Sequence, residues 1–93
     1  MLDFYLIRDE QPSILSAHLK YVCGIEWEEF EAAQIACIIE NHLDYYGKFR
    51  WSNEQIKRKI FLSKSLDRAS LSNLTNILEK SSSSGFGLLA FGD

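Results

Sequence analysis

Hydrophobic and polar positions alternate in the first quarter of the chain. Residues 2–8 alternate and are rich in Phe, Tyr, Leu and Ile, which predicts a strand. Residues 18–25 alternate again and predict a second, half-buried strand, although residues 14–20 could instead begin with a helical turn. The polar segment between them holds the only proline, Pro12, and predicts a loop. One face of the second strand would carry Leu19, Tyr21, Cys23 and Ile25.

The spacing then changes to that of a helix, which we expect from Trp27 to Leu43. Its apolar residues cover more than half of the circumference, so this helix is predicted to be central and buried. Acidic residues crowd its first turns, where carboxylates complement the positive end of the helix dipole. These residues are Glu26, Glu28, Glu29 and Glu31.

The sharpest start signal for a helix lies at Ser52. Gln55 follows three residues later, which is the spacing of a capping box. Trp51 and Ile56 stand at the two positions of a hydrophobic staple. A helix is therefore expected from Asn53 to about Leu66.

A third helix is predicted over residues 70–80, where leucines and an isoleucine recur at helical spacing. The serines at 81–84 and Gly85 are expected to form a polar loop. In residues 86–93 the apolar side chains would point to both faces of a strand, as in a strand that is covered on both faces. We expect this strand inside a sheet; at an edge it would predict a dimer or strand pairing with a partner.

The order of elements argues for an α+β fold. We expect a small antiparallel or mixed sheet of about three strands, including both termini, packed against about three helices. The 93 residues are expected to form a single domain, 1–93.

Composition excludes several classes of protein. Apolar residues make up 46% of the chain and charged residues 25%, which is typical of a folded globular protein. No apolar run approaches the roughly 20 residues that span a bilayer, and the N-terminus lacks the features of a signal peptide. We therefore expect a cytoplasmic protein with no membrane partner. Cys23 and Cys37 are then expected to be buried thiols and not a disulfide.

Charge is distributed unevenly along the chain. Residues 1–46 hold nine acidic and two basic residues, a net −7, whereas residues 47–93 hold eight basic and four acidic residues, a net +4. Such an asymmetry can steer a charged partner, or the two halves can pair with each other. The overall charge of −3 argues against nucleic acid as a partner.

Motifs for catalysis or metal binding are missing from the sequence. Neither a CxxC nor an HxxxH spacing occurs, so no metal site and no cofactor is predicted. Cys37, His42 and Asp44 would form a triad only if their segments folded back on each other at a helix end. We predict no catalytic residue.

One stretch combines rings with positive charge. Tyr45, Tyr46, Phe49 and Trp51 interleave with Lys48 and Arg50. Three interpretations apply: a clamp between two helices, a protein-contact surface, or a stacking platform for single-stranded nucleic acid. The clamp is favoured, because the staple already uses the Trp51 side chain.

The segments "DFYLIRDEQP" and "DYYGKFRWSNEQIKRK" resemble small cytosolic bacterial proteins of unassigned function, over about the first two-thirds of the chain. In size and acidic balance the chain is also similar to immunity proteins, which bind and neutralise a toxin. Neither resemblance carries functional residues that can be placed on this sequence.

The sequence thus predicts a non-catalytic protein-binding module of the immunity or regulatory kind. Its partner would contact either an acidic patch or a ring cluster. The acidic patch is Glu26, Glu28, Glu29 and Glu31, and the ring cluster is Tyr45, Tyr46 and Phe49, with Arg50 beside it. The alternatives are a small enzyme using His42 and nearby carboxylates, or a structural subunit that forms a homodimer through its C-terminal strand.

Overall fold

The alternating segments form strands. A computed structural model describes residues 1–10, 19–64 and 71–92. Strands β1 (Leu2–Ile7), β2 (Lys20–Ile25) and β4 (Gly87–Gly92) lie where alternation or a continuous apolar run predicts them. A fourth strand, β3 (Lys48–Trp51), was not predicted, because its four residues are part of the aromatic stretch that the sequence interprets as a connection. The predicted loop beyond residue 10 and the start of the second strand at residue 18 lie outside the described residues.

The strands form one antiparallel sheet in the order β2-β1-β4-β3. The α+β class is therefore confirmed, with four strands in the part of the chain described. β4 pairs with β1 on one side and with β3 on the other, so its predicted place inside the sheet is confirmed. Both edges of β4 are thus paired within this sheet, and the homodimer through this strand stays a prediction.

A β-bulge interrupts the pairing of β1 with β2. Cys23 pairs with Phe4 and Tyr21 pairs with Tyr5, which leaves Val22 as the extra residue. A bulge of one residue reverses the alternation beyond it. Tyr21 therefore lies on the face opposite Cys23, and the prediction that both share a face is wrong.

Helix α1 (Trp27–Ile35) ends well before Leu43. The chain turns at Cys37, whose φ is 63°, and the backbone N–H of Ile38 donates to the carbonyl of Ala33 (2.8 Å). The left-handed residue stops the helix. Cys37 is consequently exposed and Cys23 half-buried, so the prediction of buried thiols is wrong for Cys37.

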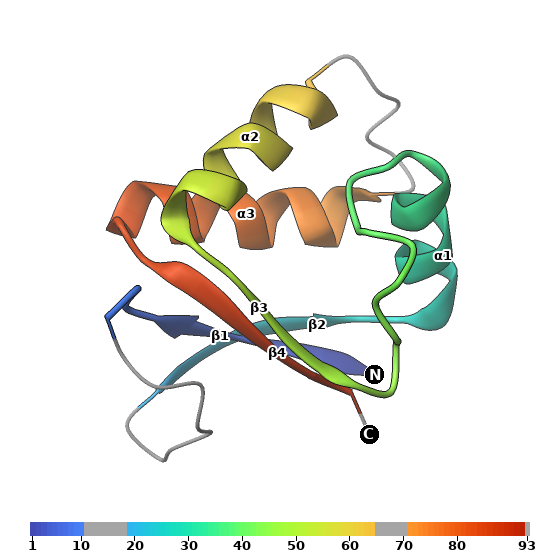
Figure 1. Cartoon of the computed structure of the whole chain (residues 1–93), viewed down its shortest axis with the longest axis horizontal. Helices are drawn as coiled ribbons and strands as arrows, with labels where there is room; N and C mark the ends of the chain where they lie inside the picture. Colours follow the sequence, from blue (N-terminus) through green and yellow to red (C-terminus); the bar gives the residue numbers. More distant parts are fainter. Residues whose placement is uncertain (11–18, 65–70, 93) are drawn as a thin grey trace.

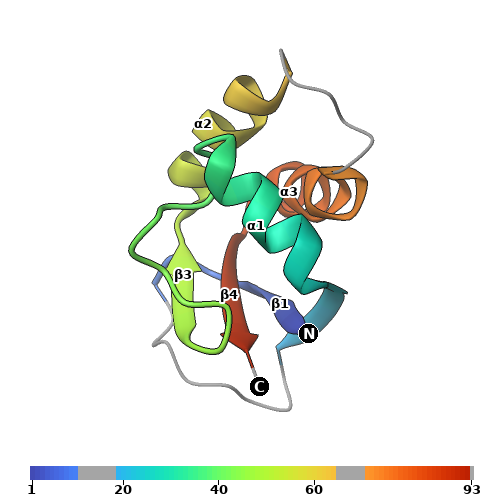
Figure 2. The ribbon, with the colours of Figure 1, turned by 90° about the vertical axis from the view of Figure 1, so that its right-hand side faces the viewer.

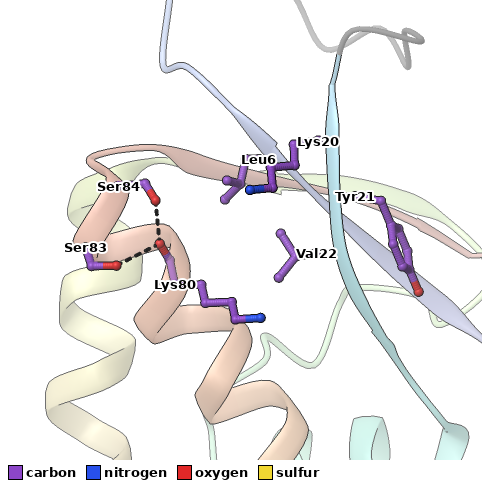
Figure 3. A pocket seen from close by; sticks show the side chains of 7 residues that line it. All are labelled: Leu6, Lys20, Tyr21, Val22, Lys80, Ser83 and Ser84. Carbon is purple, nitrogen blue, oxygen red and sulfur yellow. Dashed lines mark hydrogen bonds between the residues drawn. The ribbon is translucent and has the colours of Figure 1, made fainter.

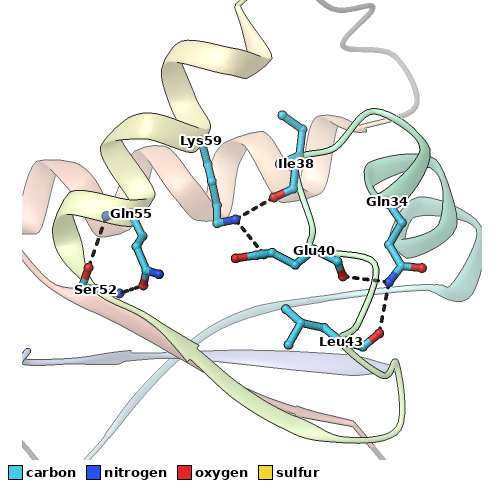
Figure 4. Close-up of polar contacts among 7 residues, drawn as sticks. All are labelled: Gln34, Ile38, Glu40, Leu43, Ser52, Gln55 and Lys59. Carbon is cyan, nitrogen blue, oxygen red and sulfur yellow. Dashed lines mark hydrogen bonds and ion pairs between the residues drawn. The ribbon is translucent and has the colours of Figure 1, made fainter.

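Helix α2 (Asn53–Ser63) begins at the predicted cap. The Gln55 backbone N–H donates to Ser52 Oγ (3.2 Å), and the Ser52 N–H donates to Gln55 Oε1 (2.8 Å), so the capping box is complete (Figure 4). The staple residues Trp51 and Ile56 are both buried in the core. The helix was expected to reach Leu66, a position that the structure does not describe.

Helix α3 (Ser72–Ser84) runs through the serines that were expected to form a loop. The Ser81 hydroxyl is buried and donates to the carbonyl of Phe86 (2.7 Å). Gly85 ends the helix in the left-handed region, at φ 76°, where a residue without Cβ is preferred. The bond from Ser81 ties the last turns of α3 to the chain that enters β4, so tertiary contact overrides the weak helix preference of serine.

The helices cover one face of the sheet, as Figures 1 and 2 show from two sides. The core lies between these layers. Its sheet side includes Leu2, Phe4, Leu6, Ile25, Leu88 and Ala90, and its helix side includes Phe30, Ile56, Leu74, Ile77 and Leu78. Of the helices in the described ranges, none has the length and apolar character that crossing a membrane requires.

Candidate functional site

A tight turn at residues 44–47 joins the segment after α1 to β3. The Tyr46 backbone N–H donates to Asp44 Oδ1 (3.0 Å), and the Gly47 N–H donates to the Asp44 carbonyl (3.0 Å). The Gly92 N–H donates to the Gly47 carbonyl (2.8 Å), which ties the turn to the end of β4. A Cβ at Gly92 would collide with the Tyr45 carbonyl, so glycine allows this close approach. The turn is therefore held rigidly against the sheet.

Three rings meet where this turn reaches the start of α1. Tyr45 is buried, and its hydroxyl donates to the Ile25 carbonyl at the long distance of 3.4 Å. The Tyr45 ring centroid lies 5.5 Å from that of Trp27 and 5.0 Å from that of Tyr46, both edge to face. Trp27 is 46% exposed and Tyr46 is 66% exposed. A buried tyrosine thus supports two exposed rings.

Carboxylates lie beside these rings. Glu26 precedes α1 and Glu28 lies in its first turn, and both side chains are exposed. Burial, followed by the negative charge of Glu26, raises the pKa of the Tyr45 hydroxyl, and Glu28 adds to the effect. We call the group Glu26, Trp27, Glu28, Tyr45 and Tyr46 the ring-and-acid surface. It joins parts of two candidate contact regions that the sequence presents as alternatives.

Glu29, from the predicted acidic patch, has a structural contact elsewhere. Its carboxylate accepts the Leu74 backbone N–H (2.7 Å) and the Asn73 side-chain amide (3.1 Å). It therefore caps the first turn of α3, whose own N-cap residue, Leu71, has no side-chain acceptor. Glu31 is exposed.

Phe49 and Arg50, from the predicted ring cluster, also have contacts inside the protein. Phe49 packs against the core, with its ring centroid 5.2 Å from that of Trp51. The Arg50 guanidinium donates to the Arg8 carbonyl (3.0 Å) and, at 3.5 Å, to that of Asp9. Of the rings proposed for contact, Tyr46 is the one that the structure leaves largely exposed.

A polar cluster around Lys59, which we call the Lys59 clamp, is shown in Figure 4; it differs from the clamp of rings that the sequence favours. The Lys59 ammonium donates to the Ile38 carbonyl (2.7 Å) and to Glu40 Oε1 (2.9 Å), and it lies 4.4 Å from the Trp51 ring centroid. The Lys59 side chain is buried, and these contacts join α2 to the segment after α1. A cation over a tryptophan face is favourable, and the carboxylate compensates its charge.

The electrostatics of the Lys59 clamp depend on Glu40. Partial burial is the largest single effect and opposes its ionisation, but the hydrogen bond and charge of Lys59, together with a backbone hydrogen bond, outweigh burial and lower the pKa of the Glu40 carboxyl. The Trp51 indole N–H also lowers the pKa of the Glu40 carboxyl. This N–H is buried, and it makes no hydrogen bond of ordinary geometry within the described residues. The ionised Glu40 carboxylate therefore helps to hold α2 against the segment after α1.

The candidate triad residues are not held together. His42 is exposed to solvent. Cys37 lies at the exposed turn after α1, beside Glu40 and Arg58 at the surface. Nothing in this geometry orients the imidazole toward the thiol.

Sequence reasoning missed two residues of these sites. Trp27 was named only as the start of a helix predicted to be buried, although it stands between Glu26 and Glu28. Lys59 was not singled out, although it lies three residues after Ile56 and therefore on the core side of α2.

Comparison of the chain with protein-family models, with curated proteins and with solved structures finds no match. Function is therefore inferred from the arrangement of these side chains.

Proposed function

We propose that this chain is a non-catalytic binding protein whose ring-and-acid surface contacts a protein partner with a basic surface. The observation that carries the proposal is the pair of exposed rings, Trp27 and Tyr46, packed on the buried ring of Tyr45. Tryptophan and tyrosine are enriched among the residues that dominate binding energy at protein interfaces. Burying them against a partner would remove apolar surface that folding leaves in water.

The charge of this surface specifies the kind of partner. Glu26 and Glu28 flank the rings, and the N-terminal half of the chain is strongly acidic. Complementary charge accelerates encounter and selects among partners. If the chain is an immunity protein, the partner is a basic toxin that it meets in the cytoplasm. If the chain is a regulatory protein, the partner is a basic protein of the same cell.

The backbone that carries the rings supports a binding role. Tyr46 lies on the hydrogen-bonded turn tied to Gly92, and Trp27 lies in the first turn of α1. Both rings are thus presented from backbone that is already ordered, which lowers the entropy lost on binding.

Site-specific photo-cross-linking in the cell of origin tests the proposal. A photoreactive phenylalanine analogue would replace Tyr46 in one variant and Phe61, an exposed ring on α2, in a matched control. We expect a cross-link to one basic protein from position 46 and not from position 61. Equal cross-linking from both positions, or none from position 46, would overturn the proposal.

A further inference from the structure

A pocket of about 190 Å³ lies between β2 and the C-terminal half of α3, as Figure 3 shows. Leu6 and Val22 form its apolar lining. Lys20 reaches it from β2 and Lys80 from α3, and in the view Val22 lies between the two ammonium groups. The Tyr21 ring points to the other side of β2 in the same view, so two lysines are the charged groups of this pocket.

The bulge in β2 explains why a lysine is here. Leu6 belongs to the core face of β1, and Lys20 pairs directly with it. Directly opposed residues of an antiparallel pair share a face. With unbroken alternation from Ile25, Lys20 would lie on the other face; the extra residue, Val22, turns it toward the helices. A local irregularity of the strand therefore brings a cation to the helix-covered side.

No carboxylate lines this pocket, although Glu79 lies beside Lys80 at a neighbouring hollow. Neither ammonium forms an ion pair or hydrogen bond within the described residues. The Ser83 and Ser84 hydroxyls both donate to the Lys80 carbonyl (3.1 and 2.9 Å), and they thereby cap one of the last carbonyls of α3. Both lysines are exposed, so water screens most of their mutual repulsion, and an anion between them would interact favourably with both.

We infer that this pocket binds the dianionic phosphate group of a small organic molecule. A phosphate monoester carries about −1.5 to −2 charges at pH 7, which two lysines neutralise. Lysine binds phosphate as a point charge and needs no planar geometry. The volume of about 190 Å³ leaves room for a phosphate and a short apolar group against Leu6 and Val22.

This site is separate from the proposed protein-binding surface and does not depend on it. Its residues come from β1, β2 and the end of α3, whereas the ring-and-acid surface comes from α1 and the turn before β3. A failure of one proposal therefore leaves the other standing.

Nuclear magnetic resonance titrations test the inference. The probes are inorganic phosphate and phenyl phosphate, added to the whole chain at constant ionic strength with chloride as reference. We expect saturable shifts at the amides of Val22 and Lys80, with tighter binding of phenyl phosphate because of its apolar ring. Lys20→Met and Lys80→Met should each weaken binding about tenfold, the effect of losing one charge-assisted contact.

Lys57→Met is the matched control, because it removes the same charge from an exposed position on α2. It should leave both titrations unchanged. Thermal unfolding is the second measurement: phenyl phosphate should raise the Tm of the wild type and of Lys57→Met more than that of Lys20→Met or Lys80→Met. Shifts that do not saturate, or that Lys57→Met weakens as much as Lys20→Met, would overturn the inference.

Discussion

The two tryptophans of this chain lie beside charged side chains in opposite settings. Trp51 is 2% exposed, and the Lys59 ammonium lies 4.4 Å from its ring centroid. Trp27 is 46% exposed, next to Glu26 and Glu28. The first ring and its cation are enclosed by the fold, whereas the second ring and its neighbouring carboxylates face solvent.

We propose that this difference separates stability from binding. The charge over Trp51 is compensated by Glu40 and the Ile38 carbonyl, so this cluster has its partners within the protein. Trp27 and Tyr46 retain surface that only another molecule can cover. Substitutions in the first cluster should therefore change the free energy of unfolding, and substitutions in the second should change partner binding.

The largest expected effect on stability comes from Trp51→Ala. Removing a fully buried aromatic ring costs about 3–5 kcal/mol of unfolding free energy, through lost burial and the cavity left behind. Trp27→Ala should cost about 1–2 kcal/mol, because only part of its ring is buried, against Phe30 and Tyr45. Urea unfolding of both variants measures the two values, and similar losses would erase the distinction between the rings.

Lys59→Met should have the next largest effect. The methionine keeps the apolar stem but leaves Glu40 and the Ile38 carbonyl without the ammonium. Breaking a buried pair costs about 3–5 kcal/mol, and we expect about 2 kcal/mol because the Glu40 side chain is 37% exposed. Lys57→Met, on the exposed side of the same helix, is the control and should change the unfolding free energy little.

The pH dependence of stability should report the same ion pair. The folded-state pKa of Glu40 lies below its ordinary value of 4.5, so its contribution is complete above that value. The contribution is lost as pH falls from about 4.5 through the lowered pKa of the folded state. The stability gap between wild type and Lys59→Met should therefore narrow in acid. Unfolding curves measured over this range would contradict the account if the gap stayed constant.

A smaller effect is expected at the start of α3. Glu29→Ala removes the acceptor of the Leu74 N–H and should cost about 1 kcal/mol, as loss of a helix cap does. Glu31→Ala removes an exposed carboxylate from α1, the helix that also carries Glu29, and should leave the Tm almost unchanged. Thermal unfolding compares the pair, and equal Tm values would show that Glu29 is not a cap.

The sequence predicts those parts of the fold that depend on local interactions. The capping box at Ser52, the staple and the apolar run of β4 are each visible within a few residues of chain. The predicted end of α1 was wrong, because tertiary contacts help to hold the segment after it: Lys59 of α2 donates to the Ile38 carbonyl (2.7 Å), a contact that joins residues distant in sequence. Strand β3 was missed for the same reason, since four residues become a strand by pairing with β4.

The candidate site was only partly predictable. Tyr46 and the glutamates were identified from residue type, but the approach of Tyr45 to Trp27 depends on how the turn folds onto α1. The Lys20 side chain lies on the helix-covered face of the sheet because of the bulge at Val22, and the alternation of polar and apolar residues does not reveal that bulge.

The most direct test of the binding account is capture of the partner from cells of origin with matched variants. Trp27→Ala/Tyr46→Ala removes the two rings of the ring-and-acid surface, and Phe61→Ala/Leu62→Ala removes two exposed apolar side chains from α2. Each variant is first shown to be folded. The account predicts that one basic protein, bound in a fixed ratio to the wild type and to the α2 variant, is lost from Trp27→Ala/Tyr46→Ala. Capture of the same protein in the same ratio by the variant that lacks both rings would contradict it.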